Sequence, residues 1–235
     1  MILNNFLKSI GLALLLCWAT VVQAAPLSAA SITYNLSLNG VRLGTITEHF
    51  EIRDGSYRAV SEARATGLLA LAQREPAHYV STGTVTPDGL RPQRFEGRHR
   101  GQSLSAAFDW TASKLTLTRD GHDQTLDLPA GAQDRLSIMY QLMFAVNDKT
   151  AMVDIAMTNG RKLERYRYAV QPDVTIDTPF KRMNTIHLVK QREDDRSGAE
   201  VWIAPEYARL PVKVLIVESD GARYEQVATH VAIKP

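Results

Sequence analysis

The feature that most constrains the fold of this chain is a set of six Asx-Gly dipeptides spread along its length. They are Asn39-Gly40, Asp54-Gly55, Asp88-Gly89, Asp120-Gly121, Asn159-Gly160 and Asp220-Gly221. Asx and Gly tolerate a positive φ, which tight hairpin turns need if their twist is to match that of the strands they join. Alternating apolar and polar residues flank nearly all of them. The pattern therefore predicts a mainly β protein, an antiparallel meander that forms a curved sheet, a sandwich or a partly closed barrel.

The first hairpin also predicts a local irregularity. Every second residue of 32–38 is apolar, and Val41 and Leu43 continue the same face after the turn. From Ile46 onward the apolar residues have the opposite parity. A β-bulge at Gly44 would return them to the core face, and we expect one there.

Further strands are expected wherever the alternation recurs. The expected ranges are 56–66, 77–86, 90–100, 103–110, 114–119, 125–128, 152–157, 163–170, 185–191, 201–203, 212–217 and 224–233. The dipeptides Pro172-Asp173 and Thr178-Pro179 predict an irregular stretch between two of these strands.

One α-helix is predicted near 134–147. Asp134 can act as its N-cap, and apolar residues from Leu136 to Val146 recur at three- and four-residue spacing. This apolar stripe favours packing on the sheet over lining a ligand pocket.

A short helical segment is predicted near 67–74, before Pro76. It is apolar on every side, and two interpretations stay open. Leu68, Leu69 and Leu71 either plug one end of the sheet or form an apolar finger that contacts acyl chains or a partner.

The N-terminus has the pattern of a cleavable signal peptide, predicted over 1–24. Lys8 precedes an apolar stretch at 10–18, and Ala24 ends a small-residue cleavage site. Residues 25–235 are then a single β-rich periplasmic domain with no transmembrane segment. The only cysteine, Cys17, follows the bulky Leu16, which argues against lipidation, so the mature chain is expected to have no thiol.

Charge disfavours nucleic acid as a partner. With Lys8 removed, 26 basic residues face 25 acidic ones. On one predicted strand Arg94, Arg98 and Arg100 share a face, where they could contact an anion such as a lipid headgroup or glycan. Glu96 lies among them, so a salt-bridged exterior face is the alternative. A second basic stretch, 161–167, has the same two interpretations.

The sequence assigns no catalytic, cofactor-binding or metal-binding residue. The six histidines lack the spacing of local metal sites, and no Gly-x-Ser-x-Gly elbow or glycine-rich phosphate loop is present. We therefore expect no cofactor and no metal.

Several motifs together resemble a known family. They are Phe108-Asp109, Asp134-x-Leu136-Ser137-x-x-Tyr140, Val201-Trp202-Ile203 and Arg209-Leu210-Pro211-Val212, following the first hairpin. In this order they resemble an exported bacterial family catalogued as domain of unknown function 3108. The resemblance spans nearly all of the mature chain and implies an envelope protein rich in antiparallel β structure. It implies no activity, cofactor or catalytic residue.

These observations favour a noncatalytic periplasmic protein that binds a partner or an amphiphile in envelope assembly or maintenance. Envelope protein, lipid and glycan are the partners considered. One alternative is an envelope hydrolase acting on glycan or ester with acids such as Asp109, Glu96 or Asp154. Another is a structural subunit of an envelope complex, which an open edge strand would favour.

Overall fold

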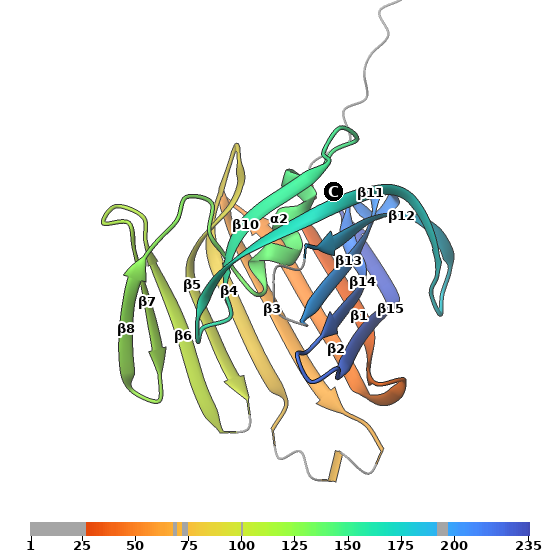
Figure 1. Ribbon diagram of the computed structural model, residues 1–235, viewed down its shortest axis with the longest axis horizontal. Helices are drawn as coiled ribbons and strands as arrows, with labels where there is room; N and C mark the ends of the chain where they lie inside the picture. The colour runs from red at the N-terminus through yellow and green to blue at the C-terminus, as the bar shows by residue number, and fades with distance from the viewer. Residues whose placement is uncertain (1–26, 68–69, 72–74, 100, 192–196) are drawn as a thin grey trace, which may run out of the picture.

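The computed structural model describes residues 27–67, 70–71, 75–99, 101–191 and 197–235. They form one sheet of 15 strands in the order β8-β7-β6-β5-β4-β3-β2-β1-β15-β14-β13-β12-β11-β10-β9 (Figure 1). The mainly β prediction is therefore confirmed. The predicted leader, Leu68, Leu69 and Arg100 lie outside the described residues.

The strands of the first half follow one another as a meander. They are β1 (Ala29–Leu38), β2 (Val41–Arg53), β3 (Ser56–Ala65), β4 (Ala77–Thr86), β5 (Gly89–His99), β6 (Gln102–Asp109), β7 (Lys114–Arg119) and β8 (His122–Asp127). The helix α2 (Ser137–Ala145) follows a two-residue strand, β9 (Gln133–Asp134).

The second half is a meander too. Its strands are β10 (Met152–Thr158), β11 (Leu163–Asp177), β12 (Arg182–Lys190), β13 (Gly198–Ala204), β14 (Leu210–Val217) and β15 (Arg223–Lys234), and the 3-10 helix η1 (Pro205–Tyr207) precedes β14. β15 pairs with β1 along its length, which joins the two halves. The pairings are antiparallel except between β9 and β10.

The Asx-Gly dipeptides lie at hairpin turns, as predicted. Asn39, Asp54 and Asp120 have φ values of 49°, 50° and 50°, and the glycine after each is also at positive φ. Such turns have the twist that lets two-residue loops join neighbouring antiparallel strands.

The bulge predicted at Gly44 is present. Leu36 of β1 pairs with Gly44 whereas Ser37 pairs with Arg42, so Leu43 is the extra residue. A Cβ on Gly44 would collide with the carbonyl oxygen of Arg64 in β3. The glycine thus permits both the change of parity and the close approach of the next strand.

Several expected boundaries differ from the structure. β11 does not stop at an irregular stretch but continues through Pro172, with a register shift beside Asp173, whose φ is 59°. β8 begins at His122 rather than near 125. The helix begins at Ser137, because Asp134 pairs with β10 before the chain turns.

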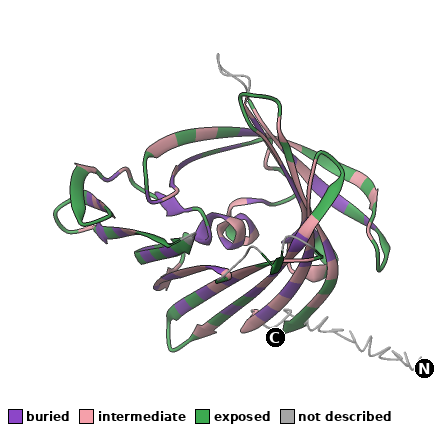
Figure 2. Ribbon diagram, turned by 90° about the horizontal axis from the view of Figure 1, so that it is seen from below, coloured by how far each residue is buried: buried purple, intermediate pink, exposed green. Residues whose placement is uncertain are grey.

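Figure 2 shows α2 at the centre of the curve that the sheet makes. Leu136 and Tyr140 belong to a hydrophobic cluster shared with the first half of the sheet, around Phe50. Ile138 and Leu142 belong to a second cluster with β10–β14. The helix therefore packs on both halves, and we call the side of the sheet facing it the inner face.

The turn between β10 and β11 packs against side chains of β5 and β6 without strand pairing. Gly160, in the β10–β11 turn, lies against the side chains of Leu104 and Phe95. Next to it, a guanidinium nitrogen of Arg161 is 3.5 Å from the Gln102 side-chain oxygen. Side-chain packing rather than strand hydrogen bonding thus joins this turn to the first half of the sheet, and we call the contact the inner seam.

Candidate functional site

A buried carboxylate on the inner face fixes the start of the helix. Asp134 Oδ1 accepts hydrogen bonds from the backbone N–H groups of Leu136 and Ser137, at 2.9 and 2.8 Å. Ser81 Oγ donates to Asp134 Oδ2 at 2.5 Å and is 2.9 Å from the Tyr57 hydroxyl. Burial raises the pKa of Asp134, and these hydrogen bonds oppose the rise.

A second buried carboxylate joins the helix to β2. The Tyr140 hydroxyl donates to Glu48 Oε2 at 3.0 Å, and its ring stacks on Phe50 with 4.2 Å between centroids. Burial raises the pKa of Glu48, whereas the hydrogen bonds from Tyr140 and Ser61 and the charge of Arg135 lower it. Glu48 is 7% exposed, so the group is held in the core.

The motifs around Trp202 and Leu210-Pro211 also serve the fold. Trp202 is 8% exposed and stacks on His187 with 4.2 Å between ring centroids. The Tyr34 hydroxyl donates to the carbonyl oxygen of Pro211 at 2.9 Å, where β13 and β14 change register. Packing and hydrogen bonding therefore explain the helix motif and the Trp202 and Leu210-Pro211 motifs without a ligand.

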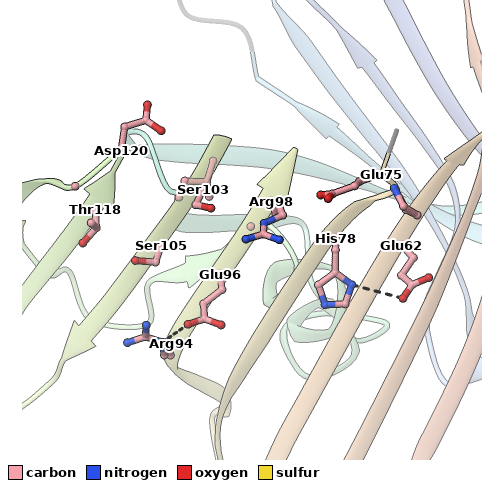
Figure 3. A pocket seen from close by; sticks show the side chains of 14 residues that line it. Glu62, Glu75, His78, Arg94, Glu96, Arg98, Ser103, Ser105, Thr118 and Asp120 are labelled. Atoms are coloured by element: carbon pink, nitrogen blue, oxygen red, sulfur yellow. Dashed lines mark hydrogen bonds and ion pairs between the residues drawn. The ribbon is translucent and has the colours of Figure 1, made fainter. Parts of the chain in front are cut away.

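The opposite, outer face of β3–β7 carries a polar hollow of about 760 Å³. We call it the outer-face trough. Its lining includes Glu62, His78, Arg94, Arg98, Ser105 and Thr118 (Figure 3). Because alternate residues of a strand point to opposite sides, these side chains face away from the core to which their neighbours Ser61, Phe95 and Ala106 contribute.

Most charges of the outer-face trough are paired. Arg94 Nε is 2.6 Å from Glu96 Oε1, and Arg64 Nη2 is 3.0 Å from Glu62 Oε2. Arg98 differs, because no described residue forms an ion pair with it. Arg94 therefore fits the salt-bridged alternative. Arg98 still fits the predicted anion contact, because its guanidinium has no described carboxylate partner.

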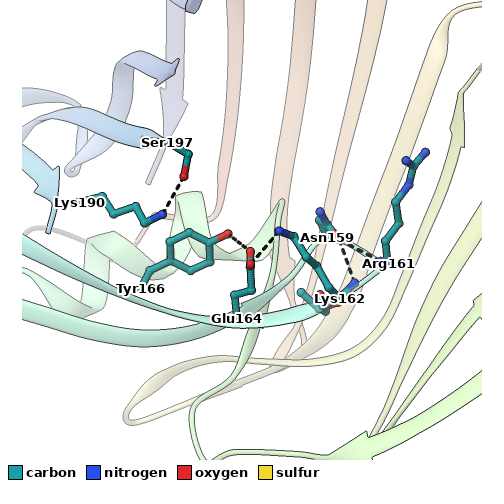
Figure 4. A network of polar contacts seen from close by, with 8 residues as sticks. Asn159, Arg161, Lys162, Glu164, Tyr166, Lys190 and Ser197 are labelled. Carbon is teal, nitrogen blue, oxygen red and sulfur yellow. Dashed lines mark hydrogen bonds and ion pairs between the residues drawn. The ribbon is translucent and has the colours of Figure 1, made fainter. Parts of the chain in front are cut away.

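Figure 4 shows that the second basic stretch is engaged. Lys162 Nζ is 2.7 Å from Glu164 Oε1, and the Tyr166 hydroxyl donates to the other oxygen of that carboxylate at 2.8 Å. On the same hairpin Arg165 and Arg167 both pair with Asp154, at 3.0 and 3.5 Å. The salt-bridged interpretation fits this region.

Of the three leucines in the predicted apolar finger, only Leu71 lies among the described residues. It is helical and 86% exposed. A plug would bury its apolar side chains, so the exposure of Leu71 favours the finger.

The acids considered for a hydrolase do not converge. Asp109 accepts backbone N–H bonds from Thr111 and Ala112, Glu96 pairs with Arg94, and Asp154 pairs with arginines of β11. Glu96 pairs in register with Ser105, four residues from Asp109, which corresponds to roughly 13 Å along the strand. That exceeds the roughly 9.5 Å upper limit for a pair of glycosidase carboxyl groups.

The described residues offer neither a metal site nor a membrane-spanning helix. Among them, no three His, Cys, Asp or Glu side chains are grouped so that they could hold a metal ion. Within the same part of the chain, no helix has the length and apolar character needed to cross a bilayer.

The sequence did not predict that these residues line one trough. Glu75 precedes β4, Ser103 and Ser105 belong to β6, and Thr118 belongs to β7. The parity of Arg94 and Arg98 indicated an outward face, but not which strands flank it. The order of strands, which brings these residues together, was the missing information.

Comparison with known proteins adds the family but no activity. No curated protein matches the sequence. A family model described as a protein of unknown function, DUF3108, matches residues 33–227. That span runs from β1 to β15 and includes the buried helix motif as well as the strands of the outer-face trough. The chain therefore belongs to the DUF3108 family.

Proposed function

We propose that the protein is a noncatalytic periplasmic protein of the cell envelope that binds an amphiphilic ligand or a partner in envelope assembly or maintenance. The observation that carries the proposal is the outer-face trough, where Arg98 lies without a described carboxylate partner. An anionic group is the natural complement of such a guanidinium, because Arg presents several N–H donors in a fixed geometry.

The inner face is a less suitable place for a ligand. α2 fills the curve of the sheet, and its side chains join hydrophobic clusters on both sides. Phe50, Phe95 and Tyr140 are among the most deeply buried side chains of the described chain. A ligand between helix and sheet would have to displace this packing, whereas the outer-face trough is already open.

The amphiphilic character of the ligand follows from Leu71. This exposed leucine lies four residues before Glu75, which lines the outer-face trough. Four residues span at most about 14 Å, so an apolar contact and a polar, charged hollow lie within the length of one lipid. An amphiphile would use both.

The alternative of a structural subunit has less support. The open edge of the sheet at β8 is polar and charged, with His122, Asp123 and Asp127 exposed. Charged side chains on an edge strand oppose pairing with another chain.

The proposal is tested by native mass spectrometry of the protein purified from the periplasm of its own cells. We expect a mature chain beginning near Ala25 without acylation, carrying a retained lipid or protein partner. Arg98→Gln should lose the retained species. Arg53→Gln, at an exposed position of β2 outside the trough, is the matched control. A protein recovered with nothing bound, or retention that does not depend on Arg98, would contradict the proposal.

A further inference from the structure

The outer-face trough contains two opposite charges that do not neutralise each other. Arg98 projects from the end of β5 and Glu75 from the connection that leads into β4 (Figure 3). Neither forms an ion pair with any residue of the described chain. The remaining acids of the trough differ, because Glu62, Glu96 and Asp120 each have a basic partner.

We propose that the outer-face trough recognises a zwitterionic lipid headgroup, with its anionic phosphate on Arg98 and its ammonium on Glu75. The inference rests on the proposed function, since it names the class of amphiphile bound at the same site. A ligand carrying both charges satisfies both side chains at once. A purely anionic ligand would leave Glu75 without a partner and would bring a second negative charge towards it.

Hydroxyl groups beside Arg98 complete the anionic half of the site. Ser103 is its register partner on β6, and Ser105 follows on the same outward face. Directly opposed residues on one face of a sheet have Cβ atoms about 5 Å apart, so these hydroxyls lie where they can donate to phosphate oxygens next to the guanidinium. Figure 3 shows Ser103, Ser105 and Arg98 on neighbouring strands.

The ammonium half lies towards the β3–β4 connection. Glu62, which lines the same part of the trough, is paired with Arg64 at 3.0 Å, so this carboxylate already has a cationic partner. The chain then leads back to the exposed Leu71 within about 14 Å. The acyl part of a lipid whose ammonium contacts Glu75 would therefore have an apolar side chain near it. A hollow of about 760 Å³ is in the range of sites that hold small ligands.

The binding test uses soluble probes and isothermal titration calorimetry of the mature protein at low ionic strength. The probes are dihexanoyl-phosphatidylethanolamine, dihexanoyl-phosphatidylglycerol and phosphoethanolamine. We expect the first to bind tightest. Phosphatidylglycerol, which lacks the ammonium, should bind about tenfold more weakly, the loss expected for one charge-assisted contact. Free phosphoethanolamine binding as tightly as the lipid would show that the ligand is a soluble headgroup and would contradict the assignment to a lipid.

Two variants separate the charges. Arg98→Gln should weaken both phospholipids about tenfold, whereas Glu75→Gln should weaken only phosphatidylethanolamine and so abolish the preference. Arg53→Gln and Glu51→Gln, neighbours on β2 and exposed, are the matched controls and should change neither.

The outcomes distinguish this inference from the function on which it rests. Equal binding of the two phospholipids that depends on Arg98 but not on Glu75 would overturn the zwitterion assignment and leave the amphiphile proposal standing. Failure of every probe to bind would also overturn the assignment. The species retained in native mass spectrometry would then decide the broader proposal by itself.

Discussion

The inner and outer faces of the same strands differ in how far their side chains are buried and in whether their charged groups have partners. On β4 and β5, the inner side chains Ser81 and Phe95 are fully buried, and Ser81 is hydrogen-bonded to Asp134 just before the helix. The outer side chains His78 and Arg98 line an open hollow. The buried carboxylates of the inner face, Asp134 and Glu48, accept hydrogen bonds. On the outer face, Arg98 and Glu75 form no ion pair with a described residue. The difference indicates that the inner face specifies the fold and that the outer face is free to specify a ligand.

On the inner face, the largest loss of stability is expected from Asp134→Ala. This change leaves Ser81 Oγ and two backbone N–H groups of the helix start without their acceptor in a buried site. We expect the free energy of unfolding to fall by about 3 kcal/mol, measured by urea denaturation at neutral pH. Asp127→Ala removes an exposed acid paired with Lys114 and should change stability far less. Similar losses for the two variants would break the comparison.

A smaller loss is expected from Tyr140→Phe. The change removes the hydroxyl that donates to Glu48 but keeps the ring stacked on Phe50. One buried hydrogen bond to a carboxyl group corresponds to about 1.5 kcal/mol of unfolding free energy. Tyr224→Phe, at a hydroxyl without a described hydrogen bond in the partly exposed β15, is the control. An unchanged midpoint for Tyr140→Phe would show that Glu48 finds another donor.

The raised pKa of Glu48 predicts how the free energy of unfolding changes with pH. Because the folded pKa is raised above 4.5, the folded state holds its proton more tightly than the unfolded state does. The resulting stabilisation is complete below the unfolded pKa and is lost as pH rises through the folded pKa. Glu48→Gln should therefore show a flatter decline of unfolding free energy from pH 4 upward. Asp134, whose pKa is raised from 3.8, should preserve part of the decline. A steeper decline in Glu48→Gln would contradict this assignment.

The inner seam between the β10–β11 turn and strands β5 and β6 is tested by Gly160→Ala. Gly160 has a φ of 84°, and an added Cβ would meet the side chain of Leu104. Gly121→Ala is a close match, since its φ is 81° and nothing lies within 4 Å of the added atom. Both should lose about 1 kcal/mol from backbone strain, and Gly160→Ala should lose more because Leu104 must move. Equal losses would mean that the seam is loosely packed.

The smallest stability effects are expected on the outer face. Arg98→Gln and Glu75→Gln remove no described ion pair, so the free energy of unfolding should stay within about 0.5 kcal/mol of wild type. Thermal denaturation checks this. A clear destabilisation by either variant would show that the outer-face trough contributes to the fold, and the contrast between the faces would be lost.

Those parts of the fold that depend on local backbone geometry could be predicted from the sequence. Asn39 and Gly40 adopt the positive φ that their turn requires, and the parity change at Gly44 identified a real bulge. The start of the helix was misplaced because Asp134 first pairs with β10, a contact far away in the chain. Pro172-Asp173 predicted an irregular stretch, yet β11 continues through it at a register shift, where a missing N–H can be accommodated.

The site was only partly predictable, because it depends on strand order. The outward parity of Arg94 and Arg98 could be read from β5 alone. That Glu96 neutralises Arg94 and leaves Arg98 without a partner requires side-chain conformations. That Glu75 shares the same hollow requires the path of the chain between β3 and β4.

The pairing of β1 with β15 has a consequence for the life history of the chain. Ala29 is in register with Lys234, so the middle of the sheet joins the first and the last of the described strands. Each meander can form hairpins from nearby residues, but the strand pair that unites them must wait until synthesis has delivered β15. Contacts of such long sequence separation are slow to form. A copy that stalls or is clipped before β15 would present the exposed border of β1 to other molecules and would be prone to aggregate.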